Sequence, residues 1–504
     1  MDFCCHFLAS VLATLVTIGV LHRYIVQKKK NSEASLPRPP PGPAGNLLLG
    51  NLLYVIGPLR HNPHRGLASL AKTYGSILSL RLGLTRTLVV VSSYDVAHEA
   101  LTKNDAALAA RLVPDNVCAL SYGTTSMVFL PSSNPLWRQL RVIIGAGFSS
   151  SRGLNVIRPI LERRARQLAE YLRECSGSGC PVNIREVVNG TVLNVISNVL
   201  FSEDVVDLRV QGTQMFKGLI VPVLEEWSKP SICDAFPFFA PLEHLLGSRR
   251  RISTHLAKLY NFFDQGIIKR RLASCENHND LLDVLLSRHA MSKLTRQEIT
   301  TFLTDMFIAA SDTSTVTVQW AMAQLLRHPD KMKKVTFELA KQLGSKDFVM
   351  EGDLTMLPYL HAVVKETLRL HPAVPLIPRE VVGDDVSLGG FHVSNGTGVV
   401  INLWAIGRDE RAWLHPEEFI PERFLVGEEV HLTGQDFIYK PFGAGRRVCP
   451  GMEYTTRSVP LLLASILHKF EWRLTDGMAP EDMELNDRYG TVLNPATPLL
   501  VVPV

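Results

Sequence analysis

Cysteines are few in this sequence, and they form no pairing pattern. Only eight occur in 504 residues, and no two of them stand in a Cys-x-x-Cys arrangement. A disulfide scaffold and a zinc site built from paired cysteines are therefore not indicated. Such sparse thiols predict a reducing compartment, where a cysteine matters for its reactivity or as a ligand.

An excess of one charge is also missing. The 53 basic and 48 acidic residues are interspersed and leave a net charge of +5, which does not favour nucleic-acid binding. Repeats and low-complexity runs are absent as well. Hydrophobic residues make up 46% of the chain, enough to build a core, which excludes a disordered protein.

Long apolar runs are lacking except near the N-terminus. Phe7–Val26 has about the length that crosses a bilayer. Three lysines follow it at positions 28–30 and no Lys or Arg precedes it, the reverse of a cleaved signal peptide. This asymmetry predicts an uncleaved single-pass anchor with the rest of the chain in the cytoplasm. We expect an anchor at 1–27, a basic and proline-rich linker at 28–45, and one large domain at 46–504.

Helical periodicity dominates the expected domain. The predicted helices cover Val156–Leu172, Val187–Leu200, Arg250–Ala273, Thr295–Leu326, Pro358–Leu370 and Met452–Phe470. The predicted β segments are a hairpin over Gly75–Val91, a patch over Val381–Val400 and the short apolar end Leu493–Val504. The fold class is therefore mainly α with a small β portion.

One predicted helix is unusually long and has a polar interruption. Thr295 and Glu298 form a capping box, and no Gly or Pro follows until Pro329. The small and polar patch 309–314 lies at its middle. Small residues there admit a ligand to the backbone, and Asp312 with Thr313 could relay protons. The alternative is that Thr313 bonds back to its own helix and Asp312 faces solvent.

The glycine-rich stretch 442–451 surrounds Cys449. Glycines let this backbone wrap closely around a group, and Pro450 places the cysteine at or just before a helix N-terminus. A helix dipole there would lower the thiol pKa, as would Arg446 and Arg447. A nucleophilic cysteine needs a general base, which no local signature supplies. A single thiolate ligand to haem iron fits better.

The same stretch resembles the haem-binding signature Phe-x-x-Gly-x-Arg-x-Cys-x-Gly of the cytochrome P450 monooxygenases at every specified position. Glu366 and Arg369 match the family's Glu-x-x-Arg pair, and Pro421–Phe424 matches the element that completes it with Arg423. Residues 137–141 match the Trp-x-x-x-Arg element. The N-terminal run and proline-rich hinge are similar to those of microsomal members, so the resemblance covers essentially the whole chain and implies the cytochrome P450 fold after the anchor.

The resemblance assigns roles to matching residues. Cys449 would be the axial ligand of the haem iron, and Phe442 would belong to the same cofactor-binding loop. Cations would bind the haem propionates together with Trp137; these are Arg141, Arg379 and Arg447. Glu366, Arg369 and Arg423 would form a buried network that supports the haem site.

The reaction implied is insertion of one oxygen atom from O2 into a C–H bond, with electrons from NADPH. Asp312 and Thr313 fall on the family's acid–alcohol pair, which delivers protons to bound dioxygen. Ala310 stands where the family usually has Gly, and its methyl group would narrow the oxygen groove.

This chain has no flavin or nicotinamide fingerprint, so an NADPH–cytochrome P450 reductase is the expected electron donor, in the endoplasmic reticulum membrane. Lys440, Arg446 and Arg447 could form part of a basic docking face, or bind propionate, or be solvated. Membrane lipid and a hydrophobic small molecule are the other expected partners.

Family positions also suggest the substrate-lining residues, which are almost all apolar and favour a hydrophobic substrate. They are Val113, Leu120, Phe307, Ala309, Ala310, Val374, Leu376 and Val492. The stretches 310–314, 441–447 and 486–490 are similar to the geraniol-hydroxylase-like plant members, which oxidise terpenoids. A monoterpene or diterpene is therefore the expected substrate. The alternatives are a phenolic or fatty-acid substrate, an oxygen-independent dehydratase or isomerase, and a non-enzymatic haem sensor.

Overall fold

A computed structural model describes residues 38–57, 59–84, 86–209, 213–229, 231–236, 247–274, 276–425 and 438–504. The predicted anchor Phe7–Val26 and most of the predicted linker lie outside these residues. Among the helices that are described, none is long and apolar enough to cross a bilayer.

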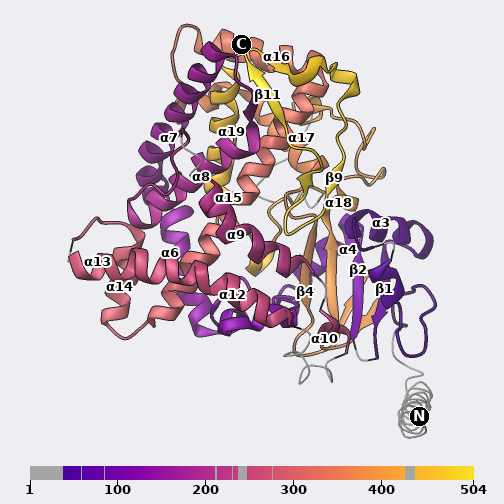
Figure 1. The fold of residues 1–504 in the computed structure, drawn as a ribbon. Helices are drawn as coiled ribbons and strands as arrows, with labels where there is room; N and C mark the ends of the chain where they lie inside the picture. The colour runs from indigo at the N-terminus through magenta and orange to yellow at the C-terminus, as the bar shows by residue number, and fades with distance from the viewer. Residues whose placement is uncertain are drawn as a thin grey trace, which may run out of the picture.

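Helices form the bulk of the described structure (Figure 1). The first group is α2 (Leu52–Ile56), α3 (Pro63–Tyr74), α4 (Tyr94–His98), α5 (Tyr122–Thr125), α6 (Pro135–Phe148), α7 (Ser151–Ser178), α8 (Ile184–Phe201) and α9 (Thr213–Ser228). The second group is α10 (Ile232–Ala235), α12 (Ser248–Asn261), α13 (Lys269–Ser274), α14 (Leu281–Ala290), α15 (Arg296–Arg327), α16 (Pro329–Leu343), α17 (Pro358–Leu370), α18 (Leu403–Ile406) and α19 (Met452–Leu467).

The strands are short and form small sheets. They are β1 (Ile77–Leu82), β2 (Arg86–Val91), β3 (Val182–Asn183), β4 (Leu376–Glu380), β5 (Val386–Leu388), β6 (Phe391–Val393), β7 (Gly398–Asn402), β8 (Trp472–Leu474), β9 (Asp487–Arg488), β10 (Asn494–Pro495) and β11 (Leu500–Pro503). The main sheet has the order β1-β2-β7-β4 and lies to one side of the helices (Figure 1). Its β2–β7 pair is parallel and its other pairs are antiparallel.

The mainly helical fold class is confirmed, and most of the predicted elements are present. The predicted hairpin is β1–β2, and Pro358–Leu370 matches α17 residue for residue. The predicted helical stretch Arg250–Ala273 is confirmed, since the chain is helical without a break from the start of α12 to the end of α13; a π-helical segment at Phe262–Ile268, which the sequence did not indicate, joins the two helices. The prediction missed α6, which carries the Trp-x-x-x-Arg element.

Helix α15 runs through the middle of the molecule (Figure 1). The predicted capping box begins it: Thr295 accepts from the Glu298 N–H, and Glu298 accepts in return. It packs against α8, α17 and α19. From Ile299 to Leu326, Ala309 is the one exposed residue of this helix, so the buried surface opens at the predicted polar patch.

Candidate functional site

The loop before α19 is shaped by two glycines. Gly443 and Gly445 have φ values of +70° and +69°, the left-handed region that glycine adopts without strain. A Cβ on Gly445 would also collide with the Asp105 carboxylate. Asp105 is held there because it accepts a hydrogen bond from the Arg446 N–H at 2.9 Å. This contact fixes the loop against the segment that follows α4.

Cys449 lies in this loop and is partly buried. Its N–H donates to the Phe442 carbonyl at 3.0 Å, which closes the loop. The predicted helix start at Met452 is confirmed, since α19 begins there with Gly451 as its cap, and Cys449 lies just before it; Pro450 is not part of the helix. The expected lowering of the thiol pKa is wrong. Burial raises the pKa of Cys449, although the Gly451 N–H, Arg141 and Arg111 act in the opposite direction.

Two of the predicted cations flank one indole ring near this cysteine. The guanidinium of Arg447 lies 4.9 Å from the centre of the Trp137 ring, and that of Arg141 lies 5.6 Å from it. Arg447 donates to the Ala109 and Leu130 carbonyls, and Arg141 donates to the Val448 carbonyl at 3.0 Å. The structure therefore brings Trp137, Arg141 and Arg447 together beside Cys449.

Two further arginines complete a cluster of positive charge. Arg379 on β4 is only 2% exposed, and its pKa falls to about 8 through burial and repulsion from Arg111 and Arg447. Arg111 also interacts with the Cys449 thiol, and its buried Nε has no partner. Within the described residues, no carboxylate forms an ion pair with these arginines or with Arg141. Sequence reasoning missed Arg111, whose burial depends on β4 and the cysteine loop.

The polar patch of α15 contains one ion pair and one helix back-bond. Thr313 donates to the Ala309 carbonyl at 2.9 Å, as the alternative interpretation expected. Asp312 does not face solvent, contrary to that interpretation. Its carboxylate is 2.5 Å from the Arg185 guanidinium of α8, and its side chain is 13% exposed. Burial raises the pKa of Asp312, and Arg185 opposes the rise.

The predicted substrate-lining residues occupy different environments. Ala309, Leu120 and Val374 are exposed, the latter two at 41% and 38%. Val113, Ala310 and Leu376 are partly buried, and Val492 is buried. Next to Val492, the Leu493 N–H donates to the Ala373 carbonyl, while the Leu493 carbonyl accepts from Trp320 of α15. The first bond joins the segment that contains Val492 to the segment that contains Val374, and the second joins the Val492 segment to α15.

Phe307 has no exposed surface. It stacks on Phe201 of α8 at 5.8 Å between ring centres and meets Phe263 edge-on at 5.0 Å. It lies among core aromatics in this structure, rather than at the opening around Ala309. The sequence around Phe307 contains no signal that distinguishes a core residue from a substrate-lining residue.

Glu366, Arg369 and Arg423 lie together, as the resemblance implied. Arg369 makes a two-point ion pair with Glu366, at 2.7 and 2.8 Å, and both side chains have no exposed surface. Arg423 donates to the same carboxylate at 3.1 Å. The remaining donors of Arg369 reach the carbonyls of Gly407, Pro416 and Glu418. The network ties α17 to the segment leading to the cysteine loop.

The suggested basic docking face is largely corrected by the structure. Lys440 and Arg447 are each 8% exposed, so neither presents its charge to a partner. Arg446 is exposed, but its guanidinium pairs with Asp105 at 3.2 Å. The sequence does not show which charged residues are buried, so a run of basic residues that looks like a surface patch can lie largely inside the protein.

The donor set fits the haem that the resemblance implies. Haem carries two carboxylates and an iron atom that binds thiolate. The arginine cluster supplies cations that no carboxylate pairs with in the part of the chain that the structure describes, and an orphaned buried guanidinium nitrogen is costly unless an anion reaches it. Cys449 lies beside these cations, and the buried surface of α15 is interrupted at the exposed Ala309.

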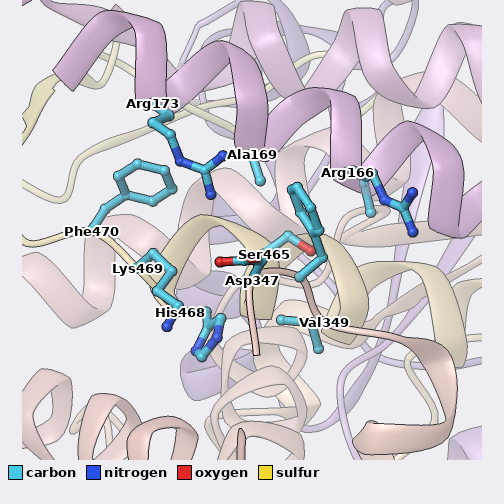
Figure 2. A pocket seen from close by; sticks show the side chains of 11 residues that line it. Arg166, Ala169, Arg173, Asp347, Val349, Ser465, His468, Lys469 and Phe470 are labelled. Carbon is cyan, nitrogen blue, oxygen red and sulfur yellow. The ribbon is translucent and has the colours of Figure 1, made fainter. Parts of the chain in front are cut away.

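A pocket lined by basic residues lies apart from the cysteine loop, between α7 and the C-terminal end of α19 (Figure 2). Its empty volume is about 280 Å³. Arg166 and Arg173 line it, but both guanidinium groups lie over the Phe348 ring, at 5.0 and 5.5 Å. None of the predicted site residues lines this pocket, so we assign it no part in the chemistry.

Comparisons with known proteins match the whole described domain. The family model of cytochrome P450 matches residues 40–502. Oryzalexin E synthase of Oryza sativa subsp. japonica is 43% identical, over 98% of this chain and 97% of that protein. Ent-cassadiene C11-alpha-hydroxylase 1 of the same organism is 41% identical, over 92% and 93%. Geraniol 8-hydroxylase of Catharanthus roseus is 38% identical, over 98% and 99%.

Proposed function

This chain belongs to the cytochrome P450 family, and we propose that it is a haem-thiolate monooxygenase that hydroxylates a plant terpenoid. The observation that carries the proposal is the cysteine loop, where Cys449 lies beside buried arginines that no described carboxylate neutralises. A relative named for a geraniol hydroxylation and another named for an ent-cassadiene hydroxylation support the substrate class.

We assign the haem to residues already in place. Cys449 would ligate the iron, with Phe442 in the same loop, and Arg111, Arg141, Arg379 and Arg447 with Trp137 would neutralise the propionates. When bound, haem supplies the activation of O2 that C–H hydroxylation requires. Because burial disfavours a free thiolate at Cys449, coordination itself must hold the sulfur deprotonated.

Asp312 and Thr313 would move protons at the opening of α15. The Thr313 hydroxyl donates its one hydrogen to the Ala309 carbonyl and has lone pairs free to accept. To pass a proton on, it would have to turn this hydrogen away from the carbonyl and accept a replacement proton through a lone pair. Asp312 is paired with Arg185 and largely buried, so it must leave this ion pair to exchange protons with water. Arg185 also contacts Asn494, which links the pair to the C-terminal segment.

The membrane and electron-transfer assignments complete the proposal. Residues 1–27 would anchor the chain in the endoplasmic reticulum membrane, 28–45 would link it, and 46–504 would be the cytosolic catalytic domain. Electrons would come from an NADPH–cytochrome P450 reductase. The surface that receives this reductase must use residues other than the buried Lys440 and Arg447.

Product identification tests the substrate class. Membranes that contain this protein and a reductase should convert at least one of a panel of monoterpenes and diterpenes to a product heavier by one oxygen atom. Formation should require NADPH, and ¹⁸O2 should label the product. A control panel of phenolics and fatty acids should be turned over more slowly. NADPH-independent conversion would instead identify a dehydratase or isomerase, and no substrate-stimulated oxygen consumption would favour a haem sensor.

Replacing Thr313 with alanine should raise peroxide release per NADPH oxidised and lower product formation. The reason is that the hydroxyl proposed to pass protons is lost, while the helix keeps a residue of high helical propensity. Product and peroxide are quantified in the same reaction. Thr317→Ala is the matched control, because Thr317 makes the same kind of back-bond one turn later and is buried. Equal coupling in both variants would remove Thr313 from the mechanism.

A further inference from the structure

A second acidic side chain of α15 is fully enclosed and has no place in the proposed chemistry. Asp305 lies seven positions before Asp312 and is only 2% exposed. One carboxylate oxygen accepts from the Tyr122 hydroxyl at 2.5 Å and from the Ser126 hydroxyl at 2.7 Å. The other accepts from the Met127 N–H at 2.8 Å. All three donors belong to one short stretch of chain.

The hydrogen-bond partners of this carboxylate are uncharged: two hydroxyl groups and one backbone N–H. Within the described residues, no Lys, Arg or His forms an ion pair with Asp305. Burial raises its pKa to about 6, and the donors of Tyr122, Ser126 and Met127 work against this rise. The group is thus ionised at neutral pH, and a buried charge of this kind depends on every donor that it has. Hydrogen bonds to an ionised acceptor are also the strong ones.

The stretch that Asp305 holds is strained. Residues 113–127 form what we name the docking segment, which includes a 3₁₀ turn at Asp115–Ser121 and α5. Leu120 and Ser121 have consecutive positive φ values of 50° and 60°, and neither is glycine. Such a conformation is unfavourable for a residue that has a side chain and persists only where its surroundings impose it.

Helix α15 contacts the strained turn itself and the residues that follow it. Gln297 donates to the carbonyl of Leu120, the first strained residue, at 3.2 Å. Asp305 holds Tyr122, Ser126 and Met127 after the turn. One helix therefore fixes both the first strained residue and the stretch that follows the turn.

Neighbouring helices add a second layer of contacts. Thr301 of α15 shares hydrogen bonds with Thr125 at 3.1 Å and with Tyr260 of α12 at 2.8 Å. The Tyr122 ring lies 4.8 Å from that of Trp227 on α9. These contacts are neutral or apolar, so Asp305 is the one charged attachment that we find between the described docking segment and α15.

We propose that Asp305 is a positioning residue that fixes the docking segment on α15 and thereby sets which carbon of the substrate is hydroxylated. The docking segment carries Val113 and Leu120, two of the expected substrate-lining residues, so the inference rests on the proposed function. Loss of the attachment would let the strained turn relax and move both side chains. The chemistry at Asp312 and Thr313, two turns further along the helix, would keep its own contacts.

Asp305→Asn tests this attachment with little change in size. An amide offers one acceptor oxygen where the carboxylate offers two, and its N–H2 group faces a donor. In the full-length haem-loaded protein, amide hydrogen exchange in residues 115–128 should become about tenfold faster or more. With a terpene that the wild type converts, the ratio of regioisomeric products should change.

Thr304→Val is the matched control. Thr304 is the buried neighbour of Asp305, but its hydroxyl bonds to the Thr300 carbonyl of its own helix at 2.9 Å. This variant should leave both the exchange rates and the product ratio unchanged. Tyr122→Phe removes a single donor and should give the same pattern in weaker form, which keeps the test available if Asp305→Asn folds poorly.

Two results in the docking segment itself would overturn the inference, and a third in the rest of the domain would as well. One is unchanged exchange in the docking segment, and the other is faster exchange with an unaltered product ratio. If the wild type converts no terpene, the proposed function fails, but the exchange measurement still decides whether Asp305 holds the segment. A global increase in exchange across α15, α17 and α19 would mean that the carboxylate serves only stability, which also contradicts the proposal.

Discussion

Cys449→Ser should abolish the red-shifted Soret band that carbon monoxide gives with a reduced, thiolate-ligated haem, and with it the hydroxylase activity. The serine hydroxyl has nearly the size of the thiol but donates far less electron density to iron. The loop itself should survive, because its shape comes from Gly443, Gly445 and the backbone bond between Cys449 and Phe442. The variant is thus expected to fold and to lose its chemistry.

A second cysteine provides the control for this measurement. Cys180 is exposed just after α7, and Cys180→Ser should leave the spectrum and the activity unchanged. The carbon monoxide spectrum of the reduced wild type decides the assignment. A Soret band without the red shift in the wild-type protein would show that Cys449 is not the ligand.

Glu366→Gln should remove a large part of the folding stability of the catalytic domain. The substitution leaves Arg369 fully buried and without its counter-charge, and Arg423 loses the same counter-charge. Breaking a buried ion pair from one side typically costs about 3–5 kcal/mol. Total stabilities are about 5–15 kcal/mol, so a loss of this size should lower the melting temperature strongly and reduce the fraction of protein that retains haem.

Thermal unfolding and haem retention measure this effect. Glu174→Gln is the control, because Glu174 pairs with Arg209 on the surface, where both side chains are more than half exposed. Removing an exposed pair should leave the melting temperature unchanged within error. Equal melting temperatures of the two variants would show that the Glu366 ion pairs add no more stability than an exposed pair.

Local signals predicted the parts of this fold that local chemistry decides. The capping box at Thr295 and the lack of Gly or Pro after it gave the start and length of α15. The apolar β pattern over Gly75–Val91 gave the β1–β2 hairpin, and helical periodicity gave both ends of α17. The glycine-rich stretch around Cys449 marked the site, because glycines in that number have no purpose in a helix or strand.

Features that depend on distant segments escaped prediction. Arg111 joins the arginine cluster because β4 and the cysteine loop cover it, and its own neighbours in sequence give no sign of this. The ion pair of Asp312 with Arg185 joins residues of two helices that are far apart in the chain. Lys440 and Arg447 belong to a charge run typical of a surface, yet packing buries both.

The main sheet also sets the time at which this protein can finish folding. Strand β2 pairs with β7, so Val91 lies opposite Ile401. During synthesis β2 therefore has no partner on this edge until about three hundred more residues have been made. At ribosomal rates of about 5–20 residues per second, that partner follows after roughly 15–60 seconds. During this interval the β1–β2 hairpin has an open edge of apolar residues, which can pair with strands of other chains. Deleting β7 would therefore harm a nascent chain more than its short length suggests.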